Sequence, residues 1–164
     1  MLDRAASDAL LVSVEEHWAE HGFGLWAVER LEDRAFLGFT GLSTPSFAAD
    51  FTPAVEVGWR FAHAAWGHGF ATEAADAALA FGFQRLALDE IVSFTAAANA
   101  RSRRVMERLG MTHDPADDFD HPRLAEEDAL RHHVLYRLSA QAWRGRRGPG
   151  TSGAMGAAEA EAGA

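Results

Sequence analysis

The clearest hydrophobic periodicity in the chain lies near its middle. Ala75, Leu79, Phe83 and Leu86 recur at spacings of four, four and three residues. This spacing places them on one face of a helix. The residues just before it, Trp66 to Ala71, are glycine-rich and predict a tight turn between a strand and this helix.

The turn itself predicts an anion site. Gly67 and Gly69 lie one residue apart, so no Cβ obstructs an approaching group. The helix that follows offers free backbone N–H groups and the positive end of its dipole. Together these features suit a phosphate or pyrophosphate. The motif alone is equally typical of a purely structural turn, so the rest of the chain has to decide.

Apolar and polar positions elsewhere predict the remaining elements. We expect a helix over residues 1–22, strands over 24–30, 35–42 and 54–61, a strand over 90–97, a helix from Ser102 to Leu109, and strands over 111–113 and 132–138. Residues 43–53 and 114–129 read as loops. A strand–helix–strand unit normally forms a parallel pair. The predicted fold is therefore α/β in the broad sense (α+β), with a mixed, mostly antiparallel twisted sheet.

Composition indicates the extent of the folded domain and limits the chemistry available to it. Residues 1–143 suit one domain, and the Gly/Ala/Ser-rich residues 144–164 read as a disordered tail. With no cysteine, thiol chemistry is excluded, which fits a cytoplasmic protein. All fifteen basic residues are arginine, so a Walker-type phosphate loop and a Schiff-base lysine are excluded too.

Charge and hydropathy limit the classes of binding partner that we expect. The net charge of −9 argues against nucleic acid and suits a cationic substrate such as an amine. No apolar run is long enough to cross a bilayer, so we expect no membrane partner.

Three segments are informative together: the run WGHGFATEA at 66–74, the pattern Asn99-x-x-Ser102-x-x-Val105 followed by Leu109-Gly110-Met111, and the strand Val55-Glu56-Val57-Gly58-Trp59. Together they resemble the GNAT (Gcn5-related) N-acetyltransferases. The first is similar to the family's acetyl-CoA pyrophosphate loop and the second to its second motif. The chain looks most similar to the RimJ/RimL branch, the ribosomal-protein N-terminal-alanine acetyltransferases. The resemblance covers roughly residues 5–140.

This resemblance implies an acetyl-CoA-dependent enzyme. It would move an acetyl group directly, in a ternary complex, to a primary amine: a protein N-terminus or a small molecule. A monomer or homodimer is expected, and no metal. The family usually begins with a strand and a helix ahead of the segment that starts here at Met1, so these elements are expected to be missing. Many members carry a tyrosine acid where this chain has Met106.

The resemblance also implies donor-binding residues. The pyrophosphate loop would be formed by Gly67, His68, Gly69, Phe70, Ala71 and Thr72. The backbone of Phe61, Ala62 and His63 would hold the acetyl-pantetheine arm, although these residues could simply end a strand. Asn99 would bond backbone or the pantetheine amide, or be an ordinary loop residue before a helix.

Glu56 and Ser102 are the catalytic candidates. Alternation with Val55 and Val57 directs Glu56 toward the cleft as a base or water-orienting residue, and an exposed strand glutamate is equally consistent. His63 is the weaker alternative base. Ser102 would be the acid near the sulfur or a plain helix N-cap.

Other functions fit less well. Asp114, Asp117, Asp118, Asp120 and His121 contain metal-ligand types, but their spacing matches no calcium loop. A dinucleotide-binding oxidoreductase would have its glycine turn near the start of the fold, not after three strands. A noncatalytic acyl-CoA-binding or degenerate GNAT module remains the main alternative.

Overall fold

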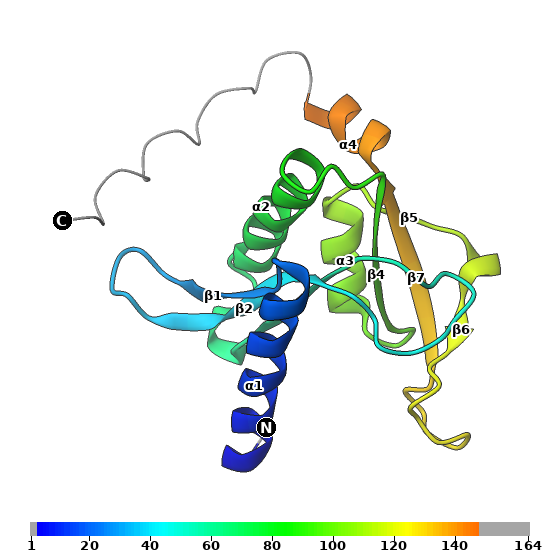
Figure 1. The fold of residues 1–164 in the computed structure, drawn as a ribbon, viewed down its shortest axis with the longest axis horizontal. Coiled ribbons are helices and arrows are strands. Elements are labelled where there is room, and N and C mark those ends of the chain that lie inside the picture. Colours follow the sequence, from blue (N-terminus) through cyan, green and yellow to red (C-terminus); the bar gives the residue numbers. More distant parts are fainter. Residues whose placement is uncertain (1–2, 148–164) are drawn as a thin grey trace.

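The computed structural model describes residues 3–147 and is built around one mixed sheet (Figure 1). Its elements are α1 (Arg4–His21), β1 (Leu25–Glu29), β2 (Phe36–Ser43), β3 (Glu56–Phe61), η1 (His63–Ala65), α2 (Phe70–Gln84), β4 (Glu90–Ala96), α3 (Ala100–Arg108), β5 (Thr112–His113), η2 (Pro115–Asp117), β6 (Phe119–Asp120), β7 (His132–Ser139) and α4 (Ala140–Arg147). The strand order is β1-β2-β3-β4-β7-β5, and β6 also pairs with β7. Every pairing is antiparallel except β3 with β4. The predicted fold class is therefore confirmed.

One face of the sheet packs against α2 and α3, which lie side by side (Figure 1). The predicted apolar stripe of α2 is confirmed, with Ala75 and Leu79 fully buried and Phe83 nearly so. Gly82 lies within this stripe, and a Cβ there would come within 2.6 Å of the Ile91 Cδ1 atom and 3.0 Å of the Leu42 Cδ1 atom. This close approach of helix to sheet explains why α2 carries a helix-weakening glycine.

The opposite face of the sheet is covered by loops and a short strand. Strand alternation places Val92, Phe94 and Leu135 on this face, opposite the α2-facing Ile91. The loop between β2 and β3 and strand β6 cover it with their own aromatic side chains. The sheet thus has a helix-covered face and a loop-covered face, and Glu56 lies on the second, because it pairs directly with Val92.

The structure corrects three boundaries. Residues 144–147 belong to α4, so the predicted disordered segment is wrong there; residues 148–164 lie outside the described residues. The helix forms because Trp143 packs against Phe83, with ring centroids 5.2 Å apart. The predicted loop 114–129 contains η2 and β6, and α3 begins at Ala100 rather than Ser102.

At the N-terminal end, the described residues begin with α1, whose end at Gly22 is as predicted. Within residues 3–147, no helix has the length and apolar character needed to cross a membrane.

Candidate active site

Strands β3 and β4 separate soon after they meet. They pair at a single position, Glu56 with Val92. One residue further, the Ser93 hydroxyl rather than a backbone N–H donates to the Val57 carbonyl, at 2.9 Å. The Val57 carbonyl points toward β4, and backbone groups two residues apart on a strand point the same way. The backbone N–H and C=O of Trp59 therefore point away from β2 and into the widening gap. The gap therefore presents unpaired backbone groups to a ligand. The sequence analysis did not include Trp59 among the candidate site residues.

We call residues 66–71, which join β3 to the start of α2, the phosphate turn. Gly67 and Gly69 have φ values of +81° and +87°, in the left-handed region that favours glycine. A Cβ at either position would meet nothing within 4 Å. Gly69 is the N-cap of α2 and carries no side chain to satisfy the helix terminus.

The backbone donors of this turn are available. Among the described residues, no hydrogen-bond partner exists for the backbone N–H groups of Gly67, His68, Gly69, Phe70 and Ala71. The Thr72 N–H, by contrast, donates to the Gly69 carbonyl at 3.0 Å. Five free N–H groups at a helix N-terminus have the geometry that can hold an anion, and the predicted phosphate site stays a prediction.

A cation lies beside the phosphate turn. The Arg101 guanidinium carbon of α3 sits 4.6 Å from the ring centroid of Trp66. The Trp66 indole in turn donates to the Phe61 carbonyl at 3.0 Å. Arg101 has no hydrogen bond or ion pair with any described residue, so its charge is not neutralised locally. This residue brings positive charge from the second motif to the mouth of the gap.

The three residues predicted to hold the pantetheine arm are only partly available. The Phe61, Ala62 and His63 carbonyls accept from the Trp66 indole, the Ala65 N–H and the Trp66 N–H. The Ala62 N–H donates to the Leu37 carbonyl at 2.9 Å. The N–H groups of Phe61 and His63 remain, since neither has a partner among the described residues. The His63 side chain is exposed and lies against the Trp66 ring, which leaves it poorly placed as a base in the cleft.

Glu56 lies at the point where β3 and β4 part. Its side chain is half-buried and has no hydrogen-bond or ion-pair partner among residues 3–147. Burial disfavours the charged carboxylate and raises the pKa of Glu56 to about 8. A Cβ at Gly58 would lie 3.7 Å from the Glu56 Oε1 atom, which shows that the carboxyl leans along the strand toward the gap.

Asn99 and Ser102 form a short hydrogen-bonded chain at the start of α3. Asn99 is the N-cap: its Oδ1 accepts from the Ser102 N–H at 3.3 Å. Its Nδ2 donates to Thr95 Oγ1 at 2.9 Å and to Ser102 Oγ at 3.0 Å. The N-cap interpretation of Ser102 is therefore wrong, because Asn99 occupies that position. The Ser102 hydroxyl accepts a bond and keeps its own proton available.

Three further residues of α3 and β7 are held by contacts within the protein. Met106, at the position of the family tyrosine, is only 1% exposed and belongs to the core. Tyr136 is buried, and its hydroxyl donates to Glu107 at 3.2 Å. Arg103 donates to the Ala97 carbonyl at 3.3 Å. None of these three side chains is free to serve the gap.

The acidic segment after β5 is held by an ion pair and by hydrogen-bond contacts. Asp117 forms an ion pair with Arg137 at 2.6 Å, and Asp118 Oδ1 lies within hydrogen-bond distance of His113 Nε2, at 2.7 Å. The hydrogen bond from Arg137 lowers the pKa of Asp117. Within the part of the chain that the structure describes, no group of three or more His, Asp or Glu side chains could hold a metal ion. These carboxylates hold the β5–β6 segment onto β7.

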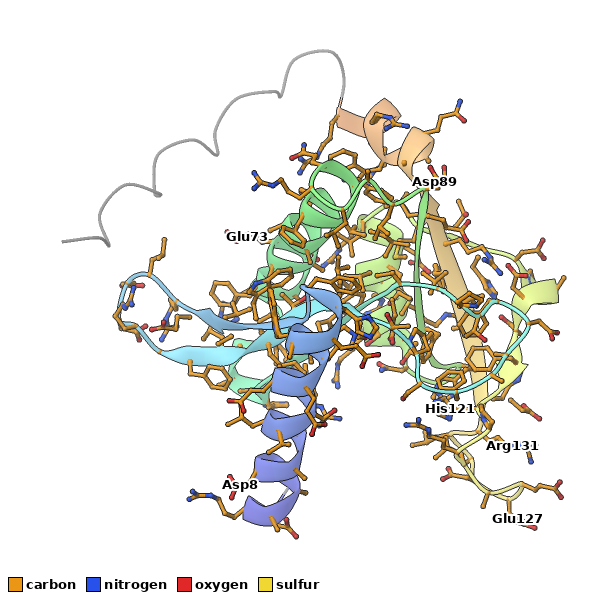
Figure 2. All side chains as sticks on the ribbon, in the orientation of Figure 1. Asp8, Glu73, Asp89, His121, Glu127 and Arg131 are labelled. Atoms are coloured by element: carbon orange, nitrogen blue, oxygen red, sulfur yellow. The ribbon has the colours of Figure 1, made fainter. Side chains whose placement is uncertain are left out.

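The loop-covered face carries an aromatic cluster that sequence reasoning did not assemble. Its members are Phe47, Phe51, Phe94, Phe119, His121 and His133, all half-buried, with ring centroids 4.7 to 6.3 Å apart. Arg123 joins two of its segments by donating to the Ser46 carbonyl at 2.8 Å. Burial, and then the charges of His133 and Arg123, lower the pKa of His121. Figure 2 shows His121 on this side, away from Glu73 of α2.

Comparison with curated proteins found similar sequences. The "FsC-acetyl coenzyme A-N(2)-transacetylase" of Aspergillus fumigatus is 30% identical over 131 residues, which cover 74% of this chain and 52% of that protein. The chain spans about half the length of the curated relatives it matches.

Solved structures share the fold. An acetyltransferase from Agrobacterium tumefaciens is 26% identical with a TM-score of 0.63, over 84% of this chain and 72% of that one. The ribosomal-protein-S5-alanine acetyltransferase of Vibrio fischeri also has a TM-score of 0.63, over the same shares, at 20% identity. That identity shows a common fold alone, so membership of the RimJ/RimL branch stays a prediction.

A family model described as "Acetyltransferase (GNAT) domain" matches residues 2–112. This match runs from α1 through α3 and includes β3, the phosphate turn and β4, and the gap lies between β3 and β4. The chain belongs to the GNAT acetyltransferase family.

Proposed function

We propose that this protein transfers an acetyl group from acetyl-CoA to a primary amine within a ternary complex. The observation that carries the proposal is the set of five free N–H groups, Gly67 to Ala71, beside the gap between β3 and β4. The donor's diphosphate would lie on these N–H groups. Its pantetheine arm would lie in the gap, against the Trp59 backbone and the Phe61 N–H. The sequence contains no cysteine, which supports direct transfer over an acyl-cysteine intermediate.

Glu56 is the general base that we propose. An amine acceptor must lose a proton before it attacks the thioester carbonyl. A carboxyl with a pKa of about 8 is matched to that task, because a general base works best when its pKa is close to the working pH. Glu56 also has no competing partner among the described residues. It would take the proton either directly or through one water.

Ser102 supports the leaving group. Its hydroxyl accepts from Asn99 and can therefore donate to another atom. The departing CoA thiolate is an acceptor at the start of α3, where the helix dipole also favours negative charge. Ser102 would stabilise the thiolate by this hydrogen bond, while Met106, buried in the core, takes no part.

The acceptor would approach from the loop-covered face, where Glu56 lies. There the aromatic cluster offers partly exposed rings beside the base. The net charge of −9 attracts a cationic amine. A protein N-terminus, as in the RimJ/RimL branch, and a small-molecule amine both fit this description.

A second candidate function is acyl-CoA binding without catalysis. It is favoured by one observation, the buried Met106 at the position where many relatives carry a tyrosine acid. The two functions share the donor site and differ only in turnover.

The deciding experiment follows free CoA thiol with a panel of primary amines and N-terminal peptides, while calorimetry measures acetyl-CoA binding. Turnover that disappears in Glu56→Gln supports the enzyme. Binding without turnover for any acceptor supports the second candidate. An absence of acetyl-CoA binding would overturn both.

A further inference from the structure

The aromatic cluster continues from Glu56 along the loop-covered face. Strands β3 and β4 run parallel from the Glu56–Val92 pair, so two residues later Gly58 is level with Phe94 across the gap. Apart from its chain neighbours, a Cβ at Gly58 would meet only the Glu56 Oε1 atom, at 3.7 Å. An amine nitrogen can therefore reach the Glu56 carboxyl above Gly58, while the group attached to that nitrogen extends toward the Phe94 ring.

The cluster favours an acceptor with a single positive charge. Its members are phenylalanines and histidines, so the cluster contains no carboxylate. The formal charge that lies over it is positive, because the Arg123 guanidinium carbon is 6.0 Å from the Phe47 ring centroid. A second ammonium group on the acceptor would lose hydration here without gaining a counter-charge. A flat apolar group would instead pack on the partly exposed rings.

Two histidines of the cluster present complementary hydrogen-bonding atoms. The His121 Nδ1 atom accepts from the Arg123 N–H at 3.3 Å, so the proton of this ring is on Nε2. The His133 Nδ1 atom lies 3.0 Å from the Arg131 carbonyl, which can only accept, so the Nε2 atom of the neutral ring has a free lone pair. Neither Nε2 atom has a hydrogen-bond partner among residues 3–147. One donor and one acceptor therefore lie on rings whose centroids are 4.9 Å apart.

A hydroxyl group satisfies both histidines at once. It accepts from the His121 Nε2–H and donates its own proton to the His133 Nε2 atom. An ammonium group has no lone pair for the first contact, and a carboxylate has no proton for the second. A trans amide has both groups, but they point in opposite directions, whereas the two rings are neighbours. Burial, and then the charges of His133 and Arg123, lower the pKa of His121 and keep its ring neutral near pH 7.

The strand register sets the length of the acceptor. His133 pairs with Ala96, two residues beyond Phe94 on β4. Figure 2 agrees, with Asp89 just before the start of β4 and His121 at the other end of the strand. Two residues of a strand span about 7 Å. A benzene ring joined to the amine by a short carbon arm covers this length.

We propose that the acceptor is a small aromatic monoamine with a ring hydroxyl, which lies between His121 and His133 while the ring packs on Phe94. The proposal rests on the proposed function, because it needs Glu56 as the base. The reaction itself is unchanged: the amine nitrogen bonds to the acetyl carbon, the carbon–sulfur bond breaks, and Glu56 takes the amine proton. The two histidines determine specificity, and they select a small molecule over a protein N-terminus.

The test compares tyramine with phenethylamine, which differ only in the ring hydroxyl, by following free CoA thiol. We expect the wild-type kcat/KM to be about tenfold or more higher for tyramine, because the hydroxyl makes two hydrogen bonds. His121→Phe and His133→Phe each keep a ring and remove one hydrogen-bonding atom, so each should reduce this preference to about threefold or less. The preference is a ratio measured on one protein sample, so partial unfolding of a variant does not change it.

His132→Phe is the matched control. This exposed histidine of β7 lies near Asp118 and Asp120 and has no ring contact with the cluster, so its substitution should leave the preference unchanged. Calorimetry of tyramine and phenethylamine on protein saturated with CoA measures the same preference without turnover.

Two results would overturn the proposal. One is equal kcat/KM for tyramine and phenethylamine in the wild-type protein, and the other is an unchanged preference in either cluster histidine variant. Faster acetylation of spermidine or of peptide N-termini than of tyramine would leave the proposed function intact and refute this inference alone. An absence of turnover with every amine would overturn the proposed function and this inference with it.

Discussion

The phosphate turn and the aromatic cluster are built in opposite ways. The turn, residues 66–71, is one continuous segment, and its binding groups are backbone N–H groups that a helix terminus leaves unpaired. The cluster comes from four segments that are far apart in the sequence, and its surface is made of side chains. The first region depends on chain geometry, whereas the second depends on the identity of each residue.

Because of this difference, we expect the two regions to respond differently to mutation. In the turn, most side chains should be replaceable, since only Gly67 and Gly69 have backbone angles that other residues rarely adopt. In the cluster, truncating one ring removes contacts with several others. Donor binding should therefore tolerate substitution of the turn's own non-glycine side chains, whereas acceptor binding should be sensitive to each ring of the cluster.

Glu56→Gln should have the largest effect on turnover. Losing a positioned general base lowers kcat by about 10²–10⁴-fold. Acetyl-CoA binding should stay within twofold, because the phosphate turn is untouched. In the wild-type protein, kcat/KM should rise with pH and level off above the pKa of about 8, and this limb should vanish in the variant. Glu29→Gln, at an exposed strand glutamate, is the control. Unchanged turnover in Glu56→Gln would remove Glu56 from the mechanism.

The same carboxyl makes stability depend on pH. The folded protein holds the Glu56 proton up to about pH 8, whereas the unfolded chain loses it near pH 4.5. The stability from the neutral form is thus complete below pH 4.5 and is lost as the pH rises through 8. Melting curves should show wild type losing on the order of 3 kcal/mol relative to Glu56→Gln across this range. Parallel pH dependence of the two proteins would contradict the raised pKa.

A Gly67→Ala/Gly69→Ala double variant should have the next largest effect. Both positions have positive φ, so each alanine costs about 1–2 kcal/mol in backbone strain. The methyl groups also point into the space where the diphosphate would lie, since nothing in the protein occupies it. Affinity for acetyl-CoA should fall about 30-fold or more, measured by calorimetry.

Gly22→Ala separates these two contributions. Gly22 has a φ of +72°, ends α1, and a Cβ there would also meet nothing within 4 Å. The substitution should lower the melting temperature in the same way and leave acetyl-CoA affinity unchanged. If both variants bind acetyl-CoA as well as wild type does, the turn is structural only.

The contrast also explains what could be predicted from the sequence. Local patterns predicted the turn, the apolar stripe of α2 and the parallel β3–β4 unit, because each depends on neighbouring residues. Phe47 and Phe51 were visible only as apolar residues in a polar loop. Their partners Phe94 and Phe119 lie on β4 and β6, and no local pattern joins these segments.

Helix α4 shows the same limit. Its residues include three arginines and a glycine and predicted no helix, yet Trp143 anchors it against Phe83, 60 residues earlier. Helix α4 therefore lay outside what composition could indicate. Conversely, the N-cap alternative for Ser102 is wrong, because Asn99 and Ser102 both suit an N-cap and only the geometry separates them.

Phe51→Ala tests the aromatic cluster. The Phe51 ring lies 5.0 Å from Phe119 and 5.7 Å from Phe94, so its loss should open the cluster. We expect the KM for the amine acceptor to rise about tenfold, acetyl-CoA affinity to stay within twofold, and stability to fall by about 2 kcal/mol. Phe36→Ala, at a phenylalanine that is 64% exposed, should change none of these. An equal loss of donor and acceptor binding would show that the cluster only supports the fold.

Arg101→Gln should have the smallest effect and is the sharpest test of how far the turn depends on backbone alone. Arg101 contributes one charge near the proposed diphosphate and a cation–π contact with Trp66, each worth about 1 kcal/mol at an exposed site. Affinity for acetyl-CoA should fall about fivefold at low salt, and the deficit should shrink as salt rises, because exposed charges are screened. Arg104→Gln removes the same charge from the same helix without the Trp66 contact, so it should be nearly silent. Equal effects of the two substitutions would mean that α3 acts through its overall charge, whereas no effect of either would leave the N–H groups as the whole of the anion site.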